Sequence, residues 1–371
     1  MRSEAIPLPS AVPGVQPSLS VQRFGAAGAR PRFHLQASIH ADEIPAMLAV
    51  HHLRRRLNAL EQAGAIAGEI VLVPVANPIG LGQQLLGTPI GRFDFATGAN
   101  FNRHFPDPMA LLDPGLAARL GGDEARNVAA IRDALEAAVA AVPATTPAEH
   151  LKRALLSLAI GADVVLDMHC DSEAVMHFYT LPGLAEPFAP LAALLGVRAM
   201  LLADESGDHP FDEACSRPWP LLRAAHPGSP IPLACQSATI EFRGEGDVDH
   251  ALAAADAEAL IAYMTLRGAV RGPAPVIPPP RCAPTPLAAS EPLVAPVPGI
   301  VVFRRAPGDA VAAGDVIADI VDPVTGTETP VACVSSGVFY ARTNLRFLGA
   351  GGRLGKIAGT TLVRTGKLLS P

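Results

Sequence analysis

The sequence predicts an α/β protein with a mixed, mainly parallel sheet covered by helices on both faces, followed by a small all-β module. Over the first part of the 371-residue chain, short apolar runs alternate with amphipathic helical segments, which is typical of such a sheet. A proline-rich stretch follows at 273–298. Beyond it, short β-type runs are separated by Gly, Pro and Asp turns, which indicates a small all-β domain.

The elements of the first part follow from the spacing of apolar residues. Short apolar runs predict strands at 32–38, 69–75, 163–168, 174–180, 197–202 and 237–242. Apolar residues at helical spacing predict helices at 44–60, 124–142, 147–160 and 248–266. Ligands in such folds gather at the carboxyl ends of strands. Polar residues just after these runs are therefore the candidates for a site.

The proline-rich stretch divides the chain. It contains ten prolines in 26 residues, which favours an extended conformation and excludes a helix. We therefore expect a first domain at 1–272, a linker at 273–298 and a β-module at 299–371. The alternative is a strap that lies along one compact body. Within the module, β-runs are predicted at 298–303, 307–311, 314–321 and 336–340.

Composition limits the partners. The net charge of −6 and the scattered basic residues argue against a nucleic-acid or anionic-membrane partner. Five cysteines without a CxxC pair suit a reducing cytoplasm. The first residues have no apolar core of signal-peptide type, and no uninterrupted apolar stretch reaches about 18 residues, so no membrane span is expected. We expect a cytoplasmic protein, and the sequence allows a homo-oligomer.

Four residues at predicted strand ends form a candidate metal site. His40 and Glu43 follow the first strand, His169 lies 126 residues after Glu43, and Glu241 closes a later run. Two imidazoles and a carboxylate leave the fourth position of a tetrahedral zinc ion open for water. A separate carboxylate can take the proton from that water. Singly, each signal is weak, because an HxxE pair arises by chance and a lone histidine usually belongs to a core.

The segment 98–107 adds a second feature. It places Asn102 and Arg103 among turn residues. An arginine beside an asparagine on a loop is suited to binding a carboxylate through two parallel hydrogen bonds. The alternative is a loop arginine that pairs with a local aspartate, Asp94 or Asp107.

Together these segments resemble the succinylglutamate desuccinylase/aspartoacylase branch of the zinc carboxypeptidase superfamily. The matching pieces occur in the order of the family, at 40–43, 77–80, 100–106, 167–169 and 239–241. The C-terminal piece is similar to the barrel-sandwich domain that many bacterial members carry, which resembles biotinyl and lipoyl domains. The resemblance therefore spans nearly the whole chain and implies a zinc carboxypeptidase-like fold.

The resemblance implies a role for each metal-site residue. His40, Glu43 and His169 would hold one zinc ion per chain. Glu241 would be the general base for the attacking water and then the general acid for the leaving amine. Asp167, two residues before His169, either orients a metal ligand or caps a neighbouring helix.

The arginines receive implied roles with alternatives. Arg103, with Asn102, would bind a substrate carboxylate. Arg92 would polarise the scissile carbonyl and stabilise the oxyanion, or it is a surface arginine. Arg243 lies where the family often has a smaller, glycine-rich run. It would read a second negative group on the substrate, or it pairs with Glu245, which is also a rival base.

Three other features carry expectations. The polar loop 204–213 is a candidate lid, in which His209 either touches substrate or faces solvent. Cys170 is expected to be a small packing residue. The stretch 321–328 contains no lysine where biotinyl and lipoyl domains attach their cofactor, so we predict no covalent cofactor. The module is then expected to cover the active-site mouth or to build an oligomer interface.

The leading hypothesis is a cytoplasmic zinc amidohydrolase that removes the acyl group from a small-molecule substrate, an N-acylated amino acid. A zinc carboxypeptidase that acts on short or unusual peptides is the first alternative, because each enzyme cleaves an amide near a free carboxylate. A zinc-binding or ligand-binding protein without catalysis is the second.

Overall fold

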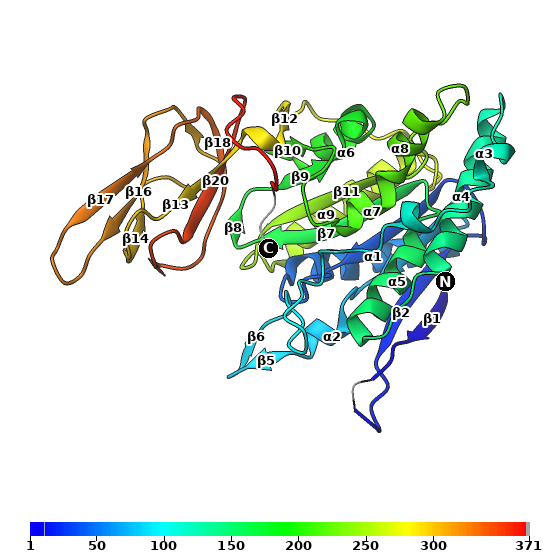
Figure 1. Cartoon of the computed structure of the whole chain (residues 1–371), viewed down its shortest axis with the longest axis horizontal. Helices are drawn as coiled ribbons and strands as arrows, with labels where there is room; N and C mark the ends of the chain where they lie inside the picture. Colours follow the sequence, from blue (N-terminus) through cyan, green and yellow to red (C-terminus); the bar gives the residue numbers. More distant parts are fainter. Residues whose placement is uncertain (11, 369–371) are drawn as a thin grey trace.

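The computed structural model describes residues 1–10 and 12–368. Over these residues the main sheet has nine strands in the order β1-β2-β4-β3-β7-β11-β9-β10-β12 (Figure 1). The strands are β1 (Arg2–Pro7), β2 (Ser18–Phe24), β3 (Arg32–Ala37), β4 (Glu69–Val73), β7 (Val164–Asp171), β9 (His177–Thr180), β10 (Ala199–Leu202), β11 (Gln236–Gly244) and β12 (Pro284–Pro286). The central pairs β4–β3, β3–β7 and β7–β11 are parallel, whereas β1–β2, β2–β4 and β9–β11 are antiparallel. The predicted mixed, mainly parallel sheet is confirmed.

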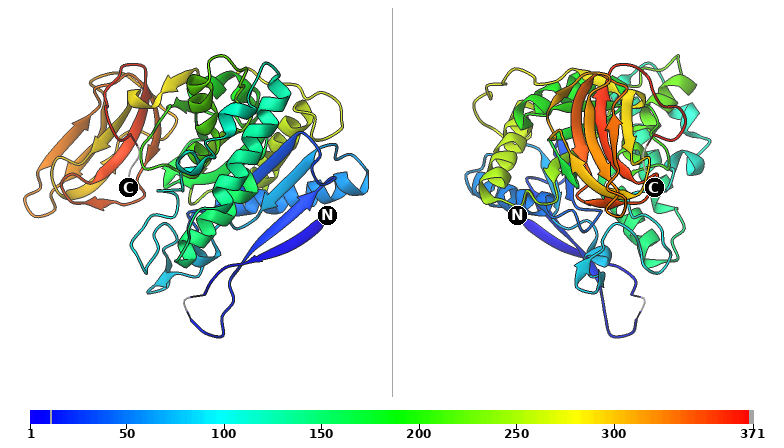
Figure 2. Two further views of the ribbon diagram at one scale, coloured as in Figure 1. Left: turned by 45° about the vertical axis from the view of Figure 1, so that its right-hand side comes forward. Right: turned by 90° about the vertical axis from the view of Figure 1, so that its left-hand side faces the viewer.

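Helices cover both faces of this sheet (Figure 2). The helices are α1 (Pro45–Gln62), α2 (Pro78–Leu81), α3 (Leu116–Arg119), α4 (Glu124–Ala140), α5 (Pro147–Ala159), α6 (Ala185–Leu195), α7 (Phe211–Ser216), α8 (Pro218–Ala225) and α9 (His250–Leu266). Buried side chains of α1, α6 and α9 form one core with one face of the sheet. Those of α4, α5, α7 and α8 form a second core on the other face. The central strands are therefore buried on both sides, which explains why β4 and β7 have nearly continuous apolar sequences.

A row of buried polar side chains interrupts the second core. His34 Nε2 lies 3.1 Å from Gln36 Oε1, and Gln36 Nε2 donates to Asp167 Oδ1 over 2.9 Å. All three side chains are fully buried, and hydrogen bonds offset much of the free-energy cost of burying polar groups. The row runs across β3 and β7 toward the candidate site.

Several elements differ from the expectation. The run 174–180 is two strands, β8 (Glu173–Ala174) and β9, and β9 runs antiparallel to β11. The prediction of one strand was wrong because β8 leaves the main sheet to pair with the C-terminal module. Strands β1 and β2 and helices α6 to α8 were not predicted. No described helix is long and apolar enough to cross a membrane.

The C-terminal part contains two further sheets, in the orders β13-β20-β18-β15 and β17-β16-β14-β19. Their strands are β13 (Ser290–Val294), β14 (Gly299–Phe303), β15 (Ala310–Val311), β16 (Val316–Val321), β17 (Glu328–Ala332), β18 (Gly337–Arg342), β19 (Phe347–Leu348) and β20 (Arg353–Gly359). Side chains from both sheets share a separate apolar core. Within 273–298, β12 pairs with β10 of the main sheet and β13 pairs with β20. The stretch therefore contributes a strand to each body.

Candidate active site

A tight loop after β3 presents His40 and Glu43. Ser38 has a left-handed backbone, with φ of 60°, and its Oγ donates to the carbonyl oxygen of Glu43 over 2.6 Å. Asn77 Nδ2 donates to the Ile39 carbonyl oxygen over 2.9 Å. These bonds fold residues 38–43 back on themselves, so that both side chains point toward the end of β7.

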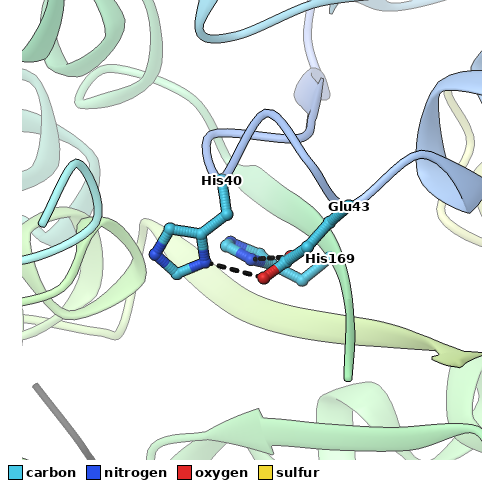
Figure 3. Close-up of side chains that lie close together, drawn as sticks. All are labelled: His40, Glu43 and His169. Carbon is cyan, nitrogen blue, oxygen red and sulfur yellow. Dashed lines mark hydrogen bonds and ion pairs between the residues drawn. The ribbon is translucent and has the colours of Figure 1, made fainter. Parts of the chain in front are cut away.

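His40, Glu43 and His169 come together at this point (Figure 3). Glu43 Oε1 lies 2.8 Å from His40 Nδ1, and Glu43 Oε2 lies 2.8 Å from His169 Nδ1. One ligand atom from each residue lies within 4.8 Å of the others, and all three side chains are buried. Although burial acts to raise it, the two imidazoles hold the pKa of Glu43 well below its usual value. Two nitrogens and a carboxylate in this arrangement could hold a metal ion.

The outer nitrogens of both imidazoles are held by oxygen atoms. His40 Nε2 lies 2.9 Å from Asn100 Oδ1, and His169 Nε2 lies 2.9 Å from Asp167 Oδ2. His169 Nε2 also lies 3.2 Å from Asn102 Nδ2. A proton on each Nε2 atom, donated to these oxygens, would leave the Nδ1 lone pairs for a metal. Asp167 therefore orients a candidate ligand, the first of the two expected alternatives. The part played by Asn100 was not predicted, although it lies in the polar loop that drew attention to Arg103.

Glu241 lies directly beside His169. The two residues are paired across the parallel strands β11 and β7. Glu241 Oε2 is inaccessible to solvent and has no hydrogen-bond partner among the described residues. Burial, and then the negative charge of Glu43, raises the pKa of Glu241 to about 8. A buried acceptor without a partner is costly, and the residue that carries it lines the same cavity as the candidate metal ligands.

Arg92 also reaches the candidate metal ligands. Its Nη1 lies 3.1 Å from His40 Nδ1 and 3.2 Å from Glu43 Oε1. The side chain is 33% exposed and lines the same cavity. A partly exposed cation beside the site is free to turn toward a polar ligand atom.

Asn102 and Arg103 lie in the cavity wall and are buried. Asn102 Oδ1 accepts a hydrogen bond of 2.9 Å from the Phe211 amide, which ties this loop to α7. Arg103 Nη1 donates to the Asn102 carbonyl oxygen over 2.8 Å. Lys152 of α5 donates a hydrogen bond to the Arg103 carbonyl oxygen over 2.7 Å.

The two aspartates considered as partners of Arg103 bond within their own turns. Asp94 accepts a hydrogen bond from Thr97 Oγ1 over 2.8 Å, and Asp107 accepts one from the Met109 amide over 2.9 Å. Both bonds are local turn contacts.

Arg243 forms a different contact from those expected. It lies within a bulge of β11, between Glu241 and Gly244, and pairs with Asp256 of α9, with Nη1 3.1 Å from Oδ1. The expected pair with Glu245 is therefore corrected to one with Asp256, and Arg243 is not among the described residues that line the cavity. Glu245 does line it, and its Oε2 accepts from Asn344 Nδ2 over 2.9 Å.

The loop 204–210 borders the cavity through Ser206 and Pro210. His209 instead lies with its Nε2 3.3 Å from Arg217 Nη1 and does not line the cavity. The Leu368 amide donates to the Ser206 carbonyl oxygen over 2.8 Å, so the last described part of the chain packs against this loop.

The cavity has a volume of about 470 Å³ and one wall from the C-terminal module. That wall includes Arg342, Arg353 and Lys356. Lys356 Nζ lies 2.5 Å from Asp171 Oδ2 at the end of β7. Strand β18 continues the contact by pairing with β8. The module therefore closes one side of the cavity. The position of Lys356 in this wall was not predicted from the sequence.

Cys170 adjoins the same carboxylate. Its amide donates to Glu43 Oε2 over 3.1 Å. Burial, and then the charge of Glu43, raises the pKa of its thiol far above the usual range. A thiol in this state is not a nucleophile, which agrees with the expected packing role.

Comparisons with known proteins address the family. A family model described as the succinylglutamate desuccinylase/aspartoacylase catalytic domain matches residues 29–140. A solved structure of a succinylglutamate desuccinylase/aspartoacylase family protein from Shewanella amazonensis SB2B is 26% identical, with a TM-score of 0.83, over 96% of this chain and 98% of that chain. A comparison with curated protein sequences gave no match.

Two further solved structures share the fold. One, in the same family by its description, is from Shewanella frigidimarina NCIMB 400, with 21% identity and a TM-score of 0.85 over 96% of this chain and 97% of that chain. The other is the ectoine utilization protein EutE from Ruegeria pomeroyi, with 15% identity and a TM-score of 0.68 over 97% of this chain and 95% of that chain.

Proposed function

We propose that this protein is a zinc-dependent hydrolase that removes the acyl group from an N-acylated amino acid. A catalytic-domain model of the succinylglutamate desuccinylase/aspartoacylase family matches residues 29–140, and the fold is similar to a solved structure described as a member of that family. The observation that carries the proposal is the position of Glu241. Its unpartnered, buried Oε2 lies beside a His/Glu/His group at the carboxyl ends of adjacent strands.

The donor set fits zinc. Imidazole nitrogens and one carboxylate oxygen are typical ligands of catalytic zinc sites, and the hydrogen bonds at both Nε2 atoms leave the Nδ1 atoms of His40 and His169 available. Glu43 is ionised, as a ligand must be. When bound, zinc supplies a Lewis acid that polarises a carbonyl and acidifies water.

The remaining roles, which are proton transfer, stabilisation of the developing charge and substrate binding, belong to side chains of the protein. Glu241, which lines the cavity, accepts the proton of the attacking water and returns it to the leaving amine. Arg92 is positioned to donate to the carbonyl oxygen as negative charge develops there. Arg103 binds the carboxylate of the substrate, and Asn102 fixes the loop that carries it. Asp167 keeps the imidazole of His169 in one orientation.

The size of the cavity favours a deacylase over a carboxypeptidase. The module wall limits the volume to about 470 Å³, which is at the lower end of the range for small-molecule sites. An N-acylated amino acid fits such a space, whereas a longer peptide would have to displace the wall.

The test is release of free amine by the zinc-loaded protein from N-acetyl, N-formyl, N-succinyl and longer N-acyl amino acids, with free dipeptides and tripeptides alongside. We expect release from the acyl amino acids. Release from peptides alone would indicate the carboxypeptidase alternative. Full zinc occupancy without hydrolysis of any compound would indicate a binding protein.

A further inference from the structure

The cavity extends beyond the row formed by His169 and Glu241. The next row of the parallel pair, toward the strand starts, is Asp167 beside Thr239. At about 3.3 Å per residue, this row lies about 7 Å deeper. Thr239 and Asp212 both line the cavity, and α7 is held over the deeper row because the Asp212 carbonyl oxygen accepts a hydrogen bond from β11. The site therefore has an inner recess that ends at α7.

The inner end of this recess is lined by the carboxyl groups of Asp212 and Glu213. Asp212 is 8% exposed, and its carboxylate forms no ion pair or side-chain hydrogen bond with any described residue. Burial, and then Glu213 and Asp167, raises its pKa to about 7, while the Glu213 amide opposes this. Glu213 Oε1 accepts from the Ser206 amide over 2.7 Å, but its Oε2 has no partner in the described part of the chain. Burying such groups without compensation is energetically unfavourable.

The cavity that contains the metal ligands and Asp212 has both apolar and polar walls. The apolar part of the lining includes Leu181, Leu201, Ala203 and Pro210, of which Leu201 and Ala203 pack on the side of the module, and Thr180, Ser206 and Thr239 line the same cavity. Apolar walls with an acceptor at the far end suit a hydrocarbon chain that ends in a donor. The cations Arg353 and Lys356 belong to the module wall, and Lys356 is already paired with Asp171.

Arg103 is a cation of the cavity wall that lies within electrostatic reach of the recess. Asp212 and Glu213 both act on the pKa of Arg103, which burial lowers. In the proposed function Arg103 binds the α-carboxylate of the substrate. The side chain of the same amino acid is then directed from the metal group toward the row of Thr239, a depth of about 7 Å that an extended ornithine side chain approaches.

We propose that Asp212 makes this recess a subsite for a cation, so that the preferred substrates are N-acylated amino acids whose side chain ends in an ammonium or guanidinium group. The inference rests on the proposed function for the placement of the substrate. The inference goes beyond the proposed function because it assigns a positive charge to the side chain of the preferred substrate.

The first test compares N-acetylornithine with N-acetylnorleucine and N-acetylglutamate on the zinc-loaded protein. Ornithine and norleucine have the same shape and differ by an ammonium in place of a methyl group. We expect kcat/KM for the ornithine compound to be higher by about tenfold or more, since a tenfold difference corresponds to one modest charge contact of about 1.4 kcal/mol. Equal values, or a preference for glutamate, would overturn the subsite.

The second test uses Asp212→Asn, which keeps the shape and removes the charge. We expect the ratio of the ornithine to the norleucine kcat/KM to fall about tenfold. Asp113→Asn, at an aspartate whose side chain is 65% exposed, is the matched control and should keep the ratio. Zinc content and the unfolding curve establish that the variants are folded. An unchanged ratio in Asp212→Asn would assign Asp212 a structural role and end the proposal.

Calorimetric binding of free ornithine and norleucine separates the two proposals. Binding of ornithine that depends on Asp212, in a protein that hydrolyses none of the amides, supports the subsite and refutes the deacylase. Hydrolysis of amides without selection for the cation refutes the subsite and leaves the deacylase. Absence of both refutes both.

Discussion

Glu241 has an environment that suits proton transfer. It is not one of the three residues, His40, Glu43 and His169, that could hold the metal ion. Its Oε2 is buried without a partner in the described part of the chain, while the metal-ligand group is completed by other side chains. We expect Glu241→Gln to lower kcat/KM by about 10²–10⁴ and to keep the zinc content. Steady-state kinetics with metal analysis checks this, with Glu205→Gln, a 53% exposed side chain, as control. Loss of zinc from Glu241→Gln would contradict the assignment.

Asp167 acts on the metal site through His169. Its Oδ2 fixes His169 Nε2, and its Oδ1 accepts from Gln36. In Asp167→Asn the negative charge that holds the imidazole is lost, so we expect zinc affinity to fall by about 10–100-fold. Competition with a chromogenic chelator measures the affinity, and Asp113→Asn serves as the surface control. An affinity equal to that of the parent would show that Asp167 serves only the core.

At the scale of elements, β3 contains a histidine that the fold keeps neutral. Burial lowers the pKa of His34 to about 4, against an ordinary value near 6.5. Between these values the unfolded chain binds more protons at this position, so the free energy of unfolding decreases as the pH falls below 6.5 and is unaffected above it. The loss attributable to His34 is about 2 kcal/mol at pH 5.

Urea unfolding of the parent and of His34→Gln, at pH 7 and pH 5 with a chelator present, isolates this effect. His177 also has a pKa lowered by burial to about 4, but it is common to both proteins. We expect the parent to lose about 2 kcal/mol more than the variant between the two pH values. Equal losses would show that His34 gains a proton without disturbing the fold.

The elements that sequence could predict are those with a local signal. Helix α5 has proline and a capping box from Thr146 and Glu149, and β4 is a continuous apolar run. Strand β8 carries no such signal, because its partner lies in β18, more than 160 residues later. Short helix α7 owes its position to tertiary contacts with β11 and the loop at Asn102.

The same distinction applies to the site. His40 and Glu43 are detectable because they share one loop, and His169 and Glu241 because each ends an apolar run. Lys356 was not assigned to the cavity, since its partner Asp171 is distant in sequence and the contact depends on how two bodies dock.

At the scale of the whole molecule, the ion pair between Lys356 and Asp171 links the module to the end of β7. Both side chains are partly exposed, at 24% and 21%, so screening reduces the contribution of the pair. We expect Lys356→Met to lower the free energy of unfolding by about 1–2 kcal/mol. It should also raise KM, because the cavity wall loosens.

A double-mutant cycle with Asp171→Asn tests this contact. Removing both partners should cost less than the sum of the single changes, with a coupling of about 1 kcal/mol. Strict additivity would mean that the pair does not join the two bodies. Arg304→Met, which removes a pair with Asp319 inside the module, is the control for general effects on the module.

The wall contributed by β18 and β20 has a consequence for how the protein is made. A ribosome synthesises the residues of the candidate metal group and of α7 well before it reaches the module. Domains generally fold as they emerge, so the first part of the chain can fold before the module exists. The nascent chain therefore passes through a stage in which the candidate metal ligands exist but the cavity is open on one side. Under the proposed function, selection among substrates by size would depend on the module, and hydrolysis by a chain still on the ribosome would be less selective.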